Sequence, residues 1–215
     1  FYKFSNFYLN ISRYLNQDFF SYDTLLAENF YFIGDLKKAK SIYFDLGKNG
    51  SAFKWHSAKQ VSRILLKENK KQKAIVNLTS TYDRIKQKNI YQTFDLAKFL
   101  KNNEKFKEII KKYKKIINSI DKTHPLFPQV TDGRGVAYER IGQWEKAEKD
   151  LLSSLDINPN QAYVINYLAY SWIEKGIKIK ESLAMLEKAN NLKSNDPYII
   201  DSLGWALFKL SKYKN

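Results

Sequence analysis

The most constraining feature of this chain is a residue pattern that recurs about every 34 residues. Leu168-Ala169 returns 35 positions later as Leu203-Gly204, and Gly135 lies 34 positions before Ala169. A bulky residue follows each of these small residues by three positions. Small residues at set offsets, repeated with this period, are typical of stacked helical hairpins. The pattern therefore predicts an all-α fold in which each hairpin packs against the next.

The small residues have a packing role in such a fold. Two antiparallel helices approach closely only where one side chain is small, so a small residue is expected opposite a bulky one. A single hairpin cannot bury its apolar face alone, and the neighbouring hairpin covers it. The positions expected to carry the repeat are Ala39, Ala74, Ala97, Gly135, Tyr138, Ala147, Pro159, Ala169, Trp172, Ala189 and Gly204.

Three segments resemble a named family. The residue types and spacing of Gly135–Tyr138, Gly142–Ala147 and Asn158–Pro159 are similar to those of the tetratricopeptide repeat (TPR). The second copy departs from the family pattern, because Ser194 stands where proline is usual. The resemblance implies a right-handed α-solenoid of stacked antiparallel helix hairpins, the TPR-like superhelix.

The same template divides the whole chain into repeats that form one solenoid. We expect a half repeat, with its second helix only, at residues 1–19. Three divergent TPR-like hairpins follow over 20–123, at roughly 20–53, 54–88 and 89–123. Two clear TPR hairpins occupy 128–196, and residues 197–215 form the first helix of a truncated repeat.

Composition limits the classes of function. The chain contains no cysteine, which excludes disulfides and thiol chemistry, and no run of about 18 apolar residues that could span a membrane. The formal net charge is +15, and the densest lysine run is Lys105–Lys115. At helical spacing the isoleucines of this run face the core and the lysines face water. The alternative is a basic patch for nucleic acid or anionic lipid.

The resemblance also implies a partner-binding groove. In TPR proteins the first helix of each hairpin lines a concave surface, and transferring its inward positions gives Lys59, Arg63, Lys98, Tyr163, Asn166, Tyr170, Tyr198, Asp201 and Trp205. Aromatic side chains supply contact area at low entropic cost, and the Asn166 amide can pair with the backbone of an extended peptide. The alternative for Tyr170 and Trp205 is packing against a neighbouring hairpin.

The sequence predicts no catalytic residue, no metal site and no cofactor. His56 and His124 fall in different hairpins without an acidic neighbour at helical spacing. Asp132–Gly135 lacks the spacing of a phosphate-binding loop, and no strand precedes it, so its glycines are expected to be close-packing positions within a helix. Glu148 is expected to be a surface charge that pairs locally with Lys149.

Three functions remain open at this point. The first is a non-catalytic scaffold or adaptor that binds a peptide or protein partner in the concave groove. The alternatives are a basic solenoid that binds RNA or an anionic surface, and a regulatory arm of an enzyme outside this fragment. Residues 166–172 and 198–205 resemble repeats of bacterial TPR adaptor lipoproteins. That resemblance implies a bacterial periplasmic or outer-membrane-associated location, with the cytoplasm as the alternative.

Overall fold

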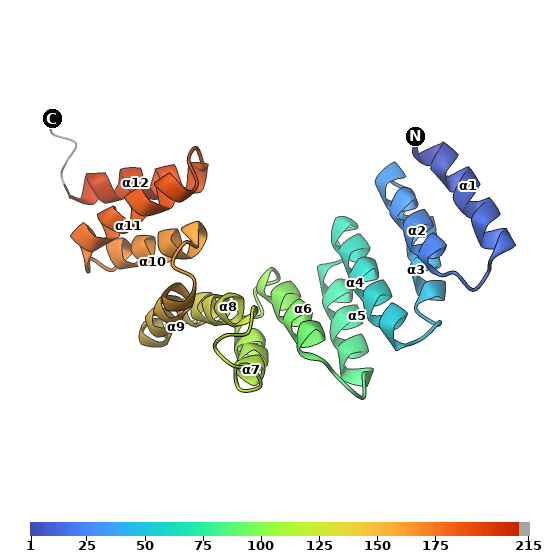
Figure 1. The fold of residues 1–215 in the computed structure, drawn as a ribbon, viewed down its shortest axis with the longest axis horizontal. Helices are drawn as coiled ribbons and strands as arrows, with labels where there is room; N and C mark the ends of the chain where they lie inside the picture. The colour runs from blue at the N-terminus through green and yellow to red at the C-terminus, as the bar shows by residue number, and fades with distance from the viewer. Residues whose placement is uncertain (211–215) are drawn as a thin grey trace. The chain divides into compact units, whose positions relative to one another are not determined.

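The computed structural model describes residues 1–210, which form α-helices joined by turns and contain no strand (Figure 1). The predicted all-α fold is confirmed. The chain divides into two compact units, and the boundary lies between Asn103 and Glu104. Each unit is described by itself.

The first unit holds one unpaired helix, two helix hairpins and a final helix. Its helices are α1 (Tyr2–Leu15), α2 (Ser21–Ile33), α3 (Leu36–Leu46), α4 (Ser51–Lys67), α5 (Lys71–Arg84) and α6 (Ile90–Lys101). The hairpins are α2 with α3 and α4 with α5. They stack because α1 packs on α2, and α3 packs on α4.

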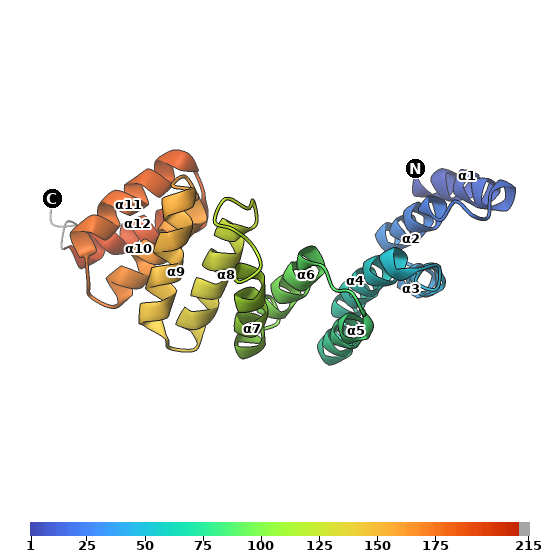
Figure 2. The ribbon, with the colours of Figure 1, turned by 60° about the horizontal axis from the view of Figure 1, so that its bottom comes forward.

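The second unit begins with one helix and continues as two hairpins and a last helix (Figure 2). Its helices are α7 (Phe106–Ile117), α8 (Phe127–Arg140), α9 (Trp144–Ile157), α10 (Ala162–Glu174), α11 (Ile179–Leu192) and α12 (Pro197–Lys209). The helix α10 contacts both α11 and α12. Residues 211–215 of the predicted truncated repeat 197–215 lie outside the described residues.

The unit boundary falls inside one predicted hairpin. The range 89–123 contains α6 and α7, and these helices belong to different compact units. The predicted hairpins on either side, 54–88 and 128–161, each contain a helix pair within one unit, α4 with α5 and α8 with α9.

A glycine followed by a capping residue makes the first hairpin turn. Gly34 ends α2 in the left-handed conformation, with φ 94°, and its N–H donates to carbonyls of the last turn. Only glycine adopts this conformation without steric cost. One residue later, Asp35 Oδ1 accepts the Lys38 N–H at 3.0 Å and starts α3. Two residues therefore reverse the chain and allow the hairpin to form.

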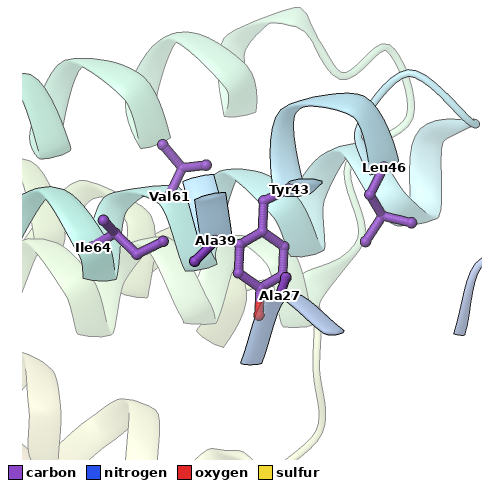
Figure 3. Close-up of a cluster of buried hydrophobic side chains, with 6 residues drawn as sticks. All are labelled: Ala27, Ala39, Tyr43, Leu46, Val61 and Ile64. Atoms are coloured by element: carbon purple, nitrogen blue, oxygen red, sulfur yellow. The ribbon is translucent and has the colours of Figure 1, made fainter. Parts of the chain in front are cut away.

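The core of the first unit lies where α2, α3 and α4 meet (Figure 3). Ala27 and Ala39 are fully buried and bring α2 and α3 close together. Tyr43 fills the space beside them, and Val61 and Ile64 close the cluster from α4. Burial of each large side chain in such a cluster contributes roughly 1.5–3 kcal/mol. The second hairpin thus covers the apolar face of the first.

Two glycines set the helix spacing in the second unit. A Cβ at Gly135 would lie 3.0 Å from Leu151 Cγ and 3.1 Å from the Ala147 carbonyl oxygen on α9. A Cβ at Gly133 would lie 2.9 Å from the ring of Tyr113 on α7. Both glycines are helical and buried, so the segment 132–135 is a packing surface of α8.

Most of the residues expected to carry the repeat are buried. Six alanines and one tryptophan are almost completely inaccessible: Ala39, Ala74, Ala97, Ala147, Ala169, Ala189 and Trp172. Tyr138 is half-buried, and Pro159 is exposed just after α9. Gly204 needs a correction, because it is exposed and no atom lies within 4 Å of its would-be Cβ. Among the described residues, no helix follows α12 to pack on it.

One packing residue has a polar side chain and was not predicted. Ser62 of α4 is fully buried, and its hydroxyl donates to the Ala74 carbonyl oxygen at 3.0 Å. Asn77 donates to the Ser62 hydroxyl, also at 3.0 Å. Serine therefore occupies the small position opposite Ala74, and its hydroxyl is satisfied by the neighbouring helix.

Candidate functional site

The predicted groove residues of the second unit come from equivalent positions of two helices in contact. Tyr163, Asn166 and Tyr170 are on α10, and their counterparts on α12 lie 35 positions later. These counterparts are Tyr198, Asp201 and Trp205. Because α10 and α12 pack against each other, one repeat period brings the two sets to neighbouring helices.

A cleft lies between these two helices and has a volume of about 510 Å³. We name it the α10–α12 cleft, and its lining residues are Tyr170, Glu174, Asp201, Gly204, Trp205 and Phe208. The Trp205 indole N–H donates to Glu174 Oε1 at 2.6 Å, and its ring stacks on Phe208 with centroids 5.3 Å apart. The predicted residues Tyr170, Asp201 and Trp205 therefore line the same cleft.

A second cleft, of about 150 Å³, continues this surface toward α8. We name it the α8–α10 cleft, and its lining residues are Glu139, Arg140, Tyr167, Tyr170, Ser171, Glu174 and Lys175. Tyr170 and Glu174 line both clefts, so the two are contiguous. Tyr167 donates to Glu139 Oε2 at 2.7 Å, and burial together with this carboxylate raises the pKa of Tyr167. The Tyr167 hydroxyl thus remains a donor at physiological pH.

Asn166 offers a hydrogen-bond acceptor that the described residues do not use. Its Oδ1 atom is buried and accepts no hydrogen bond within residues 1–210. A buried acceptor without a partner costs about 1–3 kcal/mol. Because this atom has almost no accessible surface and Asn166 lines neither cleft, a bound molecule would reach it only after the side chain turned outward.

The first turns of α10 and α12 are joined by a polar cluster. Tyr163 donates to Asp196 Oδ2 at 2.7 Å, and Lys193 forms a hydrogen bond with the Tyr163 hydroxyl. The hydrogen bond from Tyr163 lowers the pKa of Asp196. Asp196 also caps α12 by accepting the Tyr198 N–H. The Tyr163 hydroxyl therefore already has hydrogen-bond partners within the chain, whereas the Tyr198 side chain is 77% exposed.

In the first unit, two of the three predicted groove residues take part in ion pairs between repeats. Lys59 Nζ lies 2.7 Å from Asp95 Oδ2 and joins α4 to α6. Arg63 Nη2 lies 2.8 Å from Glu28 Oε2 and joins α4 to α2. Lys98 is exposed on α6. Lys59 and Arg63 thus connect the first helices of neighbouring repeats, in addition to the groove positions predicted for them.

Glu148 corrects the expectation of a local surface pair. Its carboxylate accepts the Trp172 indole N–H at 2.7 Å and pairs with Lys178 at 2.9 Å rather than with Lys149. Glu148 therefore connects α9 to the following hairpin, and the buried indole of Trp172 has a hydrogen-bond partner.

The two histidines lie in separate environments. His124 Nδ1 accepts the Leu126 N–H at 3.1 Å in the turn before α8. The His56 ring packs against Tyr43, and burial lowers the pKa of His56. Within residues 1–210, no three His, Asp or Glu side chains are grouped so that they could hold a metal ion. The described helices also include none with the length and apolar character needed to cross a membrane.

Comparison with known proteins bears on the fold. No family model matches the sequence. A TPR repeat-containing protein of Pseudomonas aeruginosa is 29% identical over 79 residues, which are 37% of this chain and 13% of that protein. A TPR protein of Parabacteroides merdae superimposes with a TM-score of 0.69 at 17% identity, over 90% of this chain and 74% of that one. The fold is that of the tetratricopeptide repeat.

Other TPR structures show the same likeness. The C-terminal part of a TPR protein of Cytophaga hutchinsonii gives a TM-score of 0.68 at 15% identity, over 100% of this chain and 84% of that one. The TPR protein YrrB gives 0.61 at 13% identity, over 90% of this chain and 96% of that one. TPR folds commonly mediate protein–protein interactions.

Proposed function

We propose that this chain is a non-catalytic scaffold that binds a segment of a protein partner on the face formed by α8, α10 and α12. The observation that carries the proposal is the pair of contiguous clefts on this face, with Tyr170 and Glu174 common to both. A surface that is continuous over three helices suits an extended segment better than a small molecule. The matched residues of α10 and α12 would contact successive parts of such a segment.

The side chains of this face suit peptide binding. Tyr170 is 38% exposed and Tyr198 is 77% exposed, so rigid aromatic rings are available for contact. Asn166 lies one turn before Tyr170 on α10, and its buried Oδ1 atom would accept a backbone N–H of the partner only after the side chain turned outward. YrrB, which shares the fold, is described as a TPR protein with an unusual peptide-binding site, and this supports peptide binding as a use of the fold.

Capture from a lysate of the source organism tests the proposal. The wild-type chain is compared with the double variant Asn166→Ala/Tyr170→Ala at low and moderate salt, with and without nuclease. A matched control removes the same side-chain types elsewhere, at exposed Asn191 of α11 and exposed Tyr8 of α1. Circular dichroism verifies that all variants keep the helical content of the wild type.

We expect a discrete protein that survives nuclease and moderate salt, that the control variant captures, and that the double variant loses. Equal capture by the double variant would place the binding face elsewhere. Recovery that disappears with nuclease, or falls steeply with salt, would instead favour nucleic-acid binding through the lysines.

A further inference from the structure

We infer that the α10–α12 cleft selects a positively charged side chain, so that the bound segment carries lysine or arginine at this point. The inference rests on the proposed function and adds the chemistry of the partner. It combines the charge of the cleft, its aromatic rings and the contacts that these groups already make.

The charge of the cleft is opposite to that of the chain. The chain has a formal net charge of +15, yet the residues lining the α10–α12 cleft include two carboxylates, Glu174 and Asp201, and no lysine or arginine. Glu174 accepts a hydrogen bond from the neutral Trp205 indole and forms no ion pair within residues 1–210. Asp201 is exposed and forms no ion pair within residues 1–210. A cation in the cleft would therefore meet two unpaired negative charges.

The cations of the adjoining α8–α10 cleft are directed to other groups. Lys175 Nζ lies 4.9 Å from the centroid of the Trp144 ring. Arg140 Nε lies 3.7 Å from Glu139 Oε2. These contacts give each cation an intramolecular partner, so the negative charge of Glu174 and Asp201 remains available to a ligand.

The aromatic rings of the cleft provide a second attraction for a cation. Tyr170, Trp205 and Phe208 line it, and an ammonium or guanidinium group is attracted to the face of such rings. Lys209 Nζ already lies 4.8 Å from the centroid of the Trp205 ring, and Phe208 stacks on that ring, so a bound cation would face Tyr170 or take the place of Lys209. Other partner chemistries fit less well: an acidic segment would be repelled, and an apolar one would cover the carboxylates without pairing them.

Selection from a displayed library of random twelve-residue peptides tests the inference on the intact chain. The net charge of the chain would by itself enrich acidic peptides. Binding in the α10–α12 cleft would enrich lysine and arginine instead, so the two causes predict opposite results. Synthetic peptides from the selection are then measured against Glu174→Gln/Asp201→Asn. The matched control is Glu187→Gln/Glu181→Gln, which neutralises two exposed carboxylates of α11.

We expect enrichment of lysine and arginine, binding about tenfold weaker to Glu174→Gln/Asp201→Asn, and unchanged binding to the control. Enrichment of acidic or uncharged peptides overturns the inference, as does equal affinity for the two charge variants. Asn166→Ala/Tyr170→Ala separates this failure from that of the proposed function. Peptides that need Asn166 and Tyr170 but not the carboxylates leave the scaffold proposal standing, whereas peptides indifferent to both variants contradict both proposals.

Discussion

At the scale of single residues, the fold depends on the absence of side-chain atoms at a few positions. Gly135 and Ala147 face each other across the seam between α8 and α9, where a Cβ on Gly135 would lie 3.1 Å from the Ala147 carbonyl oxygen. The seam has no room for a larger side chain, because protein interiors are packed about as densely as organic crystals.

Ala147→Leu should therefore overpack this seam. We expect the free energy of unfolding to fall by about 1–3 kcal/mol, because the added atoms force neighbouring side chains and backbone apart. Thermal and urea unfolding measure the change. Ala184→Leu, at an exposed position of α11, is the control and should stay within about 0.5 kcal/mol of the wild type. Equal melting of both variants would contradict the helix packing described above.

A second residue-scale prediction concerns His56. Burial, followed by the charge of Lys59, lowers the pKa of His56 from its ordinary value of 6.5, while Glu28 partly opposes this and Arg63 adds to it. The folded state then binds fewer protons than the unfolded state. The contribution of His56 is therefore favourable above about pH 6.5 and is lost progressively as the pH falls below that value.

Unfolding in urea between about pH 7.5 and pH 5.5 measures this contribution. The free energy of unfolding should decrease with falling pH in the wild type and in His124→Gln, and decrease less in His56→Gln. Because the chain has only these two histidines, His124→Gln is a matched control. The same pH dependence in all three proteins would show that His56 is not the group responsible.

At the scale of helices, a buried ion pair fastens α8 to α9. Arg134 Nε and Nη2 donate to the two carboxylate oxygens of Asp150 at 2.6 and 2.7 Å. The two side chains are only 18% and 9% exposed, so solvent screens the pair weakly. A bidentate pair of this kind fixes the rotation of one helix against the other.

Removing one partner should cost more than removing both. Asp150→Ala leaves the Arg134 charge buried without a counter-ion, and we expect a loss of about 3–5 kcal/mol in the free energy of unfolding. The double variant Arg134→Met/Asp150→Leu should recover much of this loss, because apolar side chains of similar size fill the space. Urea denaturation measures the free energy of unfolding of the wild type, of Asp150→Ala and of the double variant. A double variant less stable than Asp150→Ala would show that this account of the ion pair is wrong.

Helices and packing residues were more predictable than the contacts between repeats. The period of about 34 residues predicted Ala39, Ala147 and Ala169, which are all buried, because a small residue at a helix seam leaves a direct mark in the sequence. Ser62 was not predicted, because its position opposite Ala74 depends on a hydrogen bond to the Ala74 carbonyl oxygen that leaves no pattern in the sequence. Gly204 was expected to pack, but among residues 1–210 no atom lies within 4 Å of its would-be Cβ, since a small residue shows where a helix could pack and no helix follows α12 in that range.

The candidate site was predictable in part. The sequence could name Tyr170, Asp201 and Trp205, but not Glu174, which joins the two clefts. The ion pairs of the first unit could have been predicted from the spacing of opposite charges in the sequence. Lys59 and Asp95 are 36 positions apart, about one repeat period, so stacking brings their helices together. Such an ion pair is found in the sequence when opposite charges one repeat period apart are considered. A search limited to charges one helical turn apart on the same helix does not find it.

At the scale of the whole molecule, stability should be distributed over two compact units. In repeat proteins each repeat contacts only its neighbours, so stability is approximately a sum of local terms. The boundary between the two compact units lies between Asn103 and Glu104. The stability of each unit should therefore depend mainly on the contacts within that unit. A destabilising change in one unit should therefore have little effect on the other.

Hydrogen exchange followed by mass spectrometry measures this directly. In Ala147→Leu we expect faster amide exchange in peptides from α8 to α11 and unchanged exchange in peptides from α2 to α5. The Ala184→Leu protein supplies the control for both regions. A uniform increase over all helices would show that the two units unfold together.

The central claim is that the face formed by α8, α10 and α12 binds a protein segment, and site-specific photo-crosslinking tests it most directly. A photoreactive phenylalanine derivative is placed at exposed Tyr198, three residues before Asp201 on α12, and, as control, at exposed Leu152 of α9. In cells of the source organism, we predict a crosslink from position 198 to one discrete protein, lost with Asn166→Ala/Tyr170→Ala, and none from position 152. A crosslink to nucleic acid, or equal crosslinking from both positions, would contradict the claim.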